Sequence, residues 1–416
     1  MTSFGFIFLF VLGLSTLVRI WLGARHIAYI QAHRSTVPAQ FASEISLAAH
    51  QRAADYTSAK TKLGLVSVVI DALLVLWLTL GGGVQLIYDV AARGFDGEIV
   101  RGLALIALLS VLTALVELPL GLYRTFGIEE RFGFNKMTPA LYWKDFAKNA
   151  ALAAAFGLPL AACVLWLLEA AGDYWWLYAW LVWVTFNLTV LAIYPTWIAP
   201  LFNRFSPLQD VAMKARVEAL LARCGFKVKG LMVMDGSKRS SHGNAYFTGF
   251  GKTKRIVFFD TLLARLTPPE VEAVLAHELG HFRLRHVIKR MAWIFIGSLV
   301  FLWALDFIMH QDWFYAGLNV QERTTAVALV LFFLVAPSFT FLLQPLLASY
   351  SRKHEFEADQ YAMQNASADE LASALVKLYK DNASTLTPDP VHSAFYDSHP
   401  PALARISRLQ QGRQGA

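Results

Sequence analysis

The sequence predicts an α-helical polytopic membrane protein with seven transmembrane helices and a mostly helical polar domain that carries a small β-sheet. The 416 residues are 56% hydrophobic and only 16% charged, which is less charge than a soluble chain of this size usually has. Seven apolar segments are long enough to cross a bilayer, which takes about 20 residues. The pentapeptide HELGH, at residues 277–281, lies in the polar stretch between the fifth and sixth segments.

The apolar segments define the membrane part of the chain. In order, the predicted spans are residues 4–22, 63–80, 103–122, 150–168, 175–198, 291–308 and 325–348. The first could be a signal peptide, but it has no basic segment before it and Arg19 interrupts it, so we expect a retained span.

Basic residues predict how the chain is oriented in the membrane. They concentrate in alternate loops, and basic loops mark the cytoplasmic side. The loops after spans one and three contain Arg25, Arg34, Arg52, Lys60, Lys62, Arg124, Arg131, Lys136, Lys144 and Lys148. We therefore expect the N-terminus outside and the C-terminus inside. The net charge of +7 is explained by these loops rather than by nucleic-acid binding.

Four parts follow from this pattern: residues 1–201 with five spans, a soluble segment 202–290, two further spans in 291–348, and a C-terminal segment 349–416. Within the soluble segment, residues 211–224 alternate like an amphipathic helix, and residues 231–234, 245–250 and 255–259 read as short strands. The helix with HELGH should begin at Pro268, after Thr267 and before the acidic Glu270.

HELGH predicts a catalytic metal site. His277 and His281 are four residues apart, so on a helix they share one face and can bind one ion. Glu278 lies one step around the helix and can take a proton from water. The alternative is an ordinary helix with two packed histidines and a surface glutamate. The context of the motif favours a zinc protease.

A third ligand must come from elsewhere in the chain. The HExxHxxGxxH pattern fails because Leu284 and Val287 occupy its glycine and histidine positions. About eighty residues later the chain reads SRKHEFEADQYA, residues 351–362. There Glu355 can bind the metal, and Asp359, on the same helical face, can accept the N–H of a ligand histidine. Glu357 points elsewhere and is the second candidate for the ligand.

Taken together, the motifs resemble those of the integral-membrane CAAX prenyl protease 1 family of zinc metallopeptidases. Besides HELGH and SRKHEFEAD, the similar stretches follow in order over nearly the whole chain: EERFGFN (129–135), IAPLFNRF (198–205), NAYFTGF (244–250) and DSHPP (397–401). One departure is Gly243, which stands before Asn244 where a small polar residue is expected.

The resemblance implies a fold and a site. Seven helices would surround a large water-filled chamber, closed at one end by the protease domain. One zinc ion would be held by His277, His281 and Glu355, with Glu278 as the base. His399, with Arg405 supporting the site, would stabilise the oxyanion, and Asn244 and Ala245 would present a strand edge to an extended substrate. His392 is a weaker alternative to His399.

The implied activity is cleavage near the C-terminus of peptides or proteins of the CAAX type, which are prenylated on cysteine. One alternative is a membrane quality-control endopeptidase of the HtpX type. Another is a transporter or scaffold with a structural zinc, which would need no base such as Glu278. We expect a monomer embedded in the bilayer, without nucleic-acid partners and with a cytoplasmic active site. A bacterial inner membrane is expected because the C-terminus shows no retrieval signal for the endoplasmic reticulum.

Overall fold

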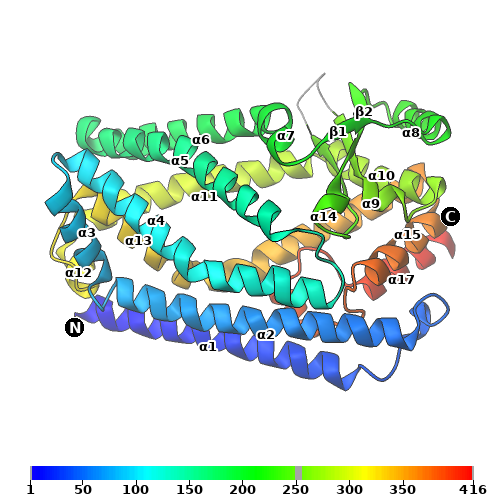
Figure 1. Cartoon of the computed structure of the whole chain (residues 1–416), viewed down its shortest axis with the longest axis horizontal. Coiled ribbons are helices and arrows are strands. Elements are labelled where there is room, and N and C mark those ends of the chain that lie inside the picture. Colours follow the sequence, from blue (N-terminus) through cyan, green and yellow to red (C-terminus); the bar gives the residue numbers. More distant parts are fainter. Residues whose placement is uncertain (1, 249–254, 415–416) are drawn as a thin grey trace.

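The computed structural model describes residues 2–248 and 255–414, and this part of the chain is mostly helical (Figure 1). Within it, seven helical segments are long and apolar enough to cross a membrane, and each overlaps one predicted span. The seven predicted spans are thereby confirmed. The segments are Ser3–Ala32, Leu47–Leu78, Glu98–Glu129, Pro139–Ala170, Gly172–Phe202, His286–Met309 and Thr325–Asn365.

Several of these helices extend well beyond the predicted apolar segments. Helix α2 (Leu47–Leu78) begins 16 residues before residue 63, and α5 (Pro139–Ala170) begins 11 residues before residue 150. Both start at capping residues, where the side chains of Ser46 and Thr138 accept backbone N–H groups. Hydropathy detects only the part of a helix that matches the bilayer, so it misses the polar turns beyond it.

The spans contact one another in a closed order. Helix α1 packs on α2, α2 on α4, α4 on α5, α5 on α6, α6 on α11, α11 on α13, and α13 on α1. The remaining bounds are α1 Ser3–Ala32, α4 Glu98–Leu122, α6 Trp175–Ile193, α11 His286–Met309 and α13 Thr325–Thr340. In the most apolar 18-residue stretch of six spans, only 6–22% of the residues are buried inside the protein. The corresponding share is 50% in the segment that contains α13. Such sparse burial agrees with helices arranged around a chamber rather than in a solid bundle.

The ring is closed at the end near the N-terminus. There α13 also packs on α4 and α5, and its buried Leu331 belongs to one apolar core with Phe8, Leu105 and Leu165. Two short helices lie at the same end, α3 (Gly83–Gly94) and α12 (Asp312–Gly317), and neither was predicted from the sequence (Figure 1).

The opposite end carries the protease segment, which is built on a mixed sheet of four strands in the order β1-β2-β4-β3. Strands β2 and β4 are parallel, and the two outer pairs are antiparallel. The bounds are β1 Phe205–Pro207, β2 Gly230–Met234, β3 Ala245–Thr248 and β4 Arg255–Phe259. The predicted strand 245–250 is thus present as β3, and its last two residues lie outside the described residues. Strand β1 was not predicted.

Helices cover this sheet and complete the domain. Helix α8 (Val211–Arg223) and α15 (Ala368–Asp381) pack on α10 (Pro268–Arg283), which carries HELGH. Helix α14 (Gln344–Asn365) continues the seventh span and packs along α10. The remaining helices of this end are α7 Ala199–Phe202, α9 Asp260–Leu263, α16 Pro390–Tyr396 and α17 Ala402–Gln414. The chain beyond the last span therefore returns to the helix that carries the motif.

Candidate metal centre

Helix α10 begins where the sequence predicts, at Pro268 after Thr267. The carboxylate of Glu270 accepts the backbone N–H of Thr267 at 2.7 Å, which pairs a donor that the helix itself leaves unpaired. The same carboxylate, which is only 2% exposed, also accepts hydrogen bonds from Ser373 and Lys377 of α15. The start of α10 is therefore anchored both along the chain and to a neighbouring helix.

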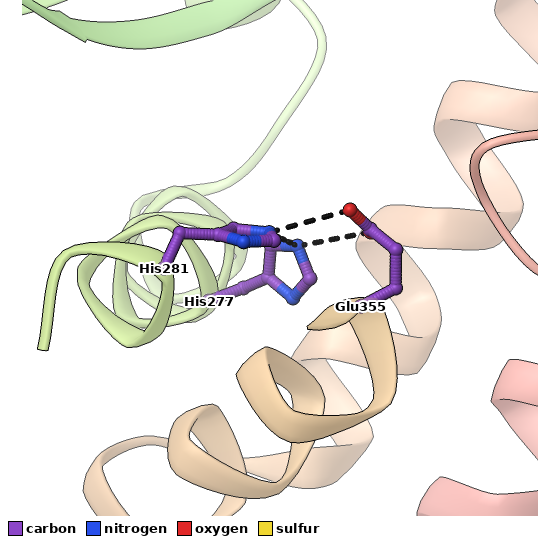
Figure 2. Close-up of side chains that lie close together, drawn as sticks. All are labelled: His277, His281 and Glu355. Carbon is purple, nitrogen blue, oxygen red and sulfur yellow. Dashed lines mark hydrogen bonds and ion pairs between the residues drawn. The ribbon is translucent and has the colours of Figure 1, made fainter. Parts of the chain in front are cut away.

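The two histidines of HELGH turn toward Glu355 of α14 (Figure 2). The Nε2 atoms of His277 and His281 each lie 3.4 Å from one oxygen of the Glu355 carboxylate. The two Nε2 atoms are 3.2 Å apart. One donor atom from each of the three residues therefore lies within 4.8 Å of the others. Helical periodicity aligns the histidines, and the packing of α14 on α10 brings in the carboxylate.

Gly280 allows α10 and α14 to approach this closely. A Cβ atom at Gly280 would lie 3.0 Å from Cα and 3.1 Å from the carbonyl oxygen of Ala358. Backbone atoms on a packed helix cannot move aside as a flexible side chain can. The glycine of HELGH therefore sets the distance between the helix of the two histidines and the helix of Glu355.

A buried network supports His277 from behind. Its Nδ1 atom lies 2.8 Å from Oδ1 of Asp359, and Arg405 of α17 donates to both oxygens of that carboxylate at 2.6 and 2.8 Å. The three side chains are all buried. Because Nδ1 faces a carboxylate, it keeps the proton when the ring is neutral, and Nε2 then has the lone pair that a metal needs.

These donors fit a bound cation. The Oε2 atom of Glu355 is buried and has no hydrogen-bond partner among the described residues. The lone pairs of two imidazole nitrogens and the oxygens of a carboxylate repel one another at this distance unless a cation or a proton lies between them. Two histidines and one glutamate are the ligand set of a catalytic zinc ion that keeps its fourth position open.

The other predicted active-site residues lie at different distances from this centre. Glu278 follows His277 on α10, and burial raises the pKa of its carboxyl group above the usual value of a glutamic acid. His399, in the loop between α16 and α17, places Nε2 3.4 Å from the Glu355 carboxylate and is otherwise largely exposed. The alternative residue His392 lies elsewhere, stacked on His26 of α1 at 3.8 Å.

Glu357, the second candidate for the third ligand, does not join His277 and His281. Its carboxylate lies 2.9 Å from Nε2 of His286, the first residue of α11. The structure thus groups Glu355, and not Glu357, with the histidines of HELGH.

Ala245 begins β3, which is an edge strand of the sheet, and Asn244 directly precedes it. The carbonyl of Asn244 accepts the N–H of Phe259 in β4 at 3.0 Å. Antiparallel pairing alternates, so the backbone groups of Ala245 and Phe247 face the open edge. There the N–H of Ala245 donates a hydrogen bond to the side-chain oxygen of Asn244 at 2.8 Å. A cavity of about 480 Å³ adjoins the strand and is lined by Tyr246 and Phe259 among others.

Comparison with known proteins agrees with this geometry over both halves of the chain. A family model described as the CAAX prenyl protease N-terminal region, with five membrane helices, matches residues 26–204, and that of peptidase family M48 matches residues 207–413. A CAAX prenyl protease 1 homolog from Oryza sativa subsp. japonica is 36% identical over 323 residues, which cover 77% of this chain and 76% of that protein. The chain belongs to the CAAX prenyl protease 1 family.

Further members extend the comparison to animals and fungi. The CAAX prenyl protease 1 homolog of Homo sapiens is 34% identical over 384 residues, or 81% of each chain. The crystal structure of S. mikatae Ste24p superposes with a TM-score of 0.91 at 29% identity, covering 98% of this chain and 99% of that one. The predicted family and fold are confirmed, and the chain is a multi-pass membrane metallopeptidase. Both of these organisms and the rice source are eukaryotes, so these relatives give no support to a bacterial inner membrane.

Some features of the centre could not be taken from the sequence alone. The contact of Gly280 with Ala358 requires two helices about eighty residues apart to be placed side by side. A small residue between the two histidines was a signal for close packing. Strand β1 spans only Phe205–Pro207 and ends in proline, which is too short and irregular for a period-two pattern.

Proposed function

We propose that the chain is a zinc-dependent endopeptidase that cuts near the C-terminus of CAAX-type substrates, prenylated on cysteine, with one zinc ion held by His277, His281 and Glu355. The proposal rests on the convergence of one donor atom from each of three residues within 4.8 Å, with His277 and Glu355 buried and His281 half-buried. When bound, zinc supplies a Lewis acid that polarises the scissile carbonyl and acidifies water. The family relationship supports a metal, and the donor set favours zinc.

Glu278 is the proton carrier in this proposal. It neighbours His277 on α10 but is not one of the three donors. As a carboxylate it accepts a proton from the attacking water, and as an acid it returns that proton to the leaving amine. Burial raises its pKa, which brings the two protonation states closer in free energy at neutral pH. A group that must gain and lose a proton in each cycle benefits from such a shift.

His399 and Arg405 lie near different oxygens of the Glu355 carboxylate, His399 near Oε1 and Arg405 near Oε2. The guanidinium of Arg405 is buried and fixed by Asp359, so it keeps the carboxylates and His277 in place. The imidazole of His399 is largely exposed and lies 3.4 Å from the Glu355 carboxylate. From there an N–H of His399 can donate to the oxyanion that develops on the scissile carbonyl.

The open edge of β3 provides a binding surface for an extended peptide. A substrate strand added there would form hydrogen bonds with the backbone groups of Ala245 and Phe247 that face the open edge. The hydrogen bond from the Ala245 N–H to the Asn244 side chain would have to break first. The neighbouring cavity of about 480 Å³ offers space for a substrate side chain on the Tyr246 face. Backbone recognition of this kind leaves the side-chain sequence of the substrate largely free.

Prenylated CAAX substrates are inferred from the family, whose members are called CAAX prenyl proteases. The match of the five-helix N-terminal model favours this class over the HtpX type, for which we expect fewer spans. A test uses two otherwise identical CAAX peptides, one farnesylated and one not, with detergent-purified protein. Release of the terminal tripeptide from the farnesylated peptide, abolished by a chelator, is expected. Cleavage of both peptides at equal rates would remove the prenyl requirement and leave a general peptidase.

The active site is proposed to face the cytoplasm, because the basic loops lie at the same end as the protease domain. Glu218 is exposed on α8 and can be replaced by cysteine in a variant with Cys163 and Cys224 changed to alanine. A membrane-impermeant maleimide should label this cysteine only after cells are opened. Labelling of intact cells would place the domain outside.

A further inference from the structure

A second cluster of histidine and glutamate lies beside the metal centre. His286, His354 and Glu357 each offer a donor atom within 4.8 Å of the others, and His286 and His354 are buried. The two imidazole rings are stacked, however, with centroids 3.9 Å apart and planes inclined by 7°. Nitrogen lone pairs lie in the ring planes, so those of parallel rings do not converge on one ion. The arrangement argues against a second metal site.

The cluster instead connects to a ligand of the first centre. The Nδ1 atom of His286 lies 3.0 Å from Nδ1 of His281, and its Nε2 atom lies 2.9 Å from the carboxylate of Glu357. These contacts form a continuous chain from His281 through His286 to Glu357. The Nε2 atom of His281, on the opposite side of its ring, faces Glu355.

The local backbone explains how His286 reaches back to His281. Helix α10 ends at Arg283, and Arg285 adopts a left-handed conformation with φ of 58°. This residue ends one helix and precedes the next, so α11 starts at His286, close to the last turn of α10. Left-handed backbone is uncommon outside glycine. The position of His286 is therefore built into the turn between the two helices.

A bound metal ion would fix which atom donates in each hydrogen bond from His281 through His286 to Glu357. If Nε2 of His281 binds a cation, its proton must be on Nδ1, which then donates to Nδ1 of His286. His286 accepts at Nδ1 and so carries its own proton on Nε2. That N–H needs an acceptor, and the Glu357 carboxylate is in place. A donor at position 357 would leave no consistent arrangement.

We infer that His286 and Glu357 are positioning residues that hold His281 in the tautomer and ring orientation required for metal binding. The inference rests on the metal centre proposed above. Each histidine of HELGH is then backed by a carboxylate, His277 directly by Asp359 and His281 through His286 by Glu357. Partners of this kind typically contribute 10- to 100-fold to metal affinity.

The test measures zinc affinity by competition with a chromophoric chelator, together with the visible spectrum of the Co²⁺-substituted protein. His286→Phe keeps an aromatic ring on His354 but removes both nitrogens, and about 10- to 100-fold weaker zinc binding with a shifted Co²⁺ spectrum is expected. Glu357→Ala should fall between His286→Phe and the wild type. Glu357→Gln, which retains an accepting oxygen, should stay within about threefold of the wild type.

His354→Phe is the matched control, because it preserves the stack on His286 without touching the contacts to His281 and Glu357. Its zinc affinity should equal that of the wild type. Melting temperatures identify any variant that fails to fold, and Glu357→Ala is the safer variant because its side chain is one-third exposed. Zinc affinity within twofold of the wild type in both His286→Phe and Glu357→Ala would overturn the inference. A wild type that binds no zinc would instead overturn the proposed function.

Discussion

The Nδ1 atom of His277 lies 2.8 Å from the carboxylate of Asp359, and Arg405 donates two hydrogen bonds to the same carboxylate. Asp359→Asn keeps the size of the side chain but removes its charge, and its amide can present a donor to Nδ1. We expect about 10- to 100-fold weaker zinc binding, measured by chelator competition. The control is Asp381→Asn, since Asp381 pairs with Arg265 at 3.7 Å outside the centre. Equal zinc affinity in Asp359→Asn and wild type would contradict the role of Asp359.

The pKa of His277 predicts how zinc uptake depends on pH. Burial alone would lower this pKa, but the carboxylates of Asp359 and Glu355 outweigh burial and raise it to about 9 in the metal-free protein. Below pH 9 the ring carries two protons, and one of them must leave before Nε2 can bind the ion. Apparent zinc affinity should therefore rise about tenfold per pH unit between pH 7 and 9, and then level off. Proton release on zinc addition, followed with an indicator dye, checks this directly. A flat affinity over that range would show that His277 is already neutral.

Gly280→Ala tests the close approach of α10 and α14. The new methyl group would lie 3.0 Å from Cα of Ala358, so the helices must separate. Overpacking of this kind costs about 1–3 kcal/mol, which exceeds the gain in helix propensity of up to about 1 kcal/mol. We expect a lower melting temperature and weaker zinc binding. Gly297→Ala in α11 is the control, because nothing lies within 4 Å of its added Cβ. Unchanged zinc affinity in Gly280→Ala would mean that Glu355 does not depend on this spacing.

Ala245→Pro tests the substrate edge. Proline removes the N–H that faces the open side of β3, while the ladder to β4 through Asn244 is on the other side. The expected result is a KM for peptide raised about tenfold, with zinc affinity unchanged. The reason is that one backbone hydrogen bond to the substrate is lost, about 1.5 kcal/mol. An unchanged KM would exclude strand addition at Ala245.

The local sequence pattern was sufficient to predict the membrane spans and the shared helical face of the two histidines of HELGH. A run of apolar residues predicts a span wherever it occurs, and a four-residue spacing on a helix predicts a shared face for His277 and His281. The same periodicity separates Glu355 and Asp359 from Glu357. The structure groups Glu355 with the histidines and turns Glu357 toward His286. These predictions needed no knowledge of the tertiary structure.

Relationships across the fold could not be read in the same way. The contact of His286 with His281 depends on the left-handed backbone of Arg285, and nothing in the side chain of arginine signals that conformation. Helix α12, with six residues, is too short to stand out from the loops between spans, whereas α3, with 12 residues, was missed although it is nearly as long as the predicted α8. Hydropathy also underestimates how far α2 and α5 continue beyond the bilayer, because a helix does not end where its apolar residues end.

The most direct test of the proposed metal centre measures zinc content and cleavage of a farnesylated CAAX peptide on the same samples. Wild type should hold one zinc ion per chain and release the terminal tripeptide. Glu278→Gln should keep the ion and lose activity about 100- to 10,000-fold, because only the proton carrier is removed. Glu355→Ala should lose the ion itself. Zinc-loaded Glu278→Gln that cleaves as fast as wild type, or Glu355→Ala that retains its zinc, would contradict the assignment of the centre.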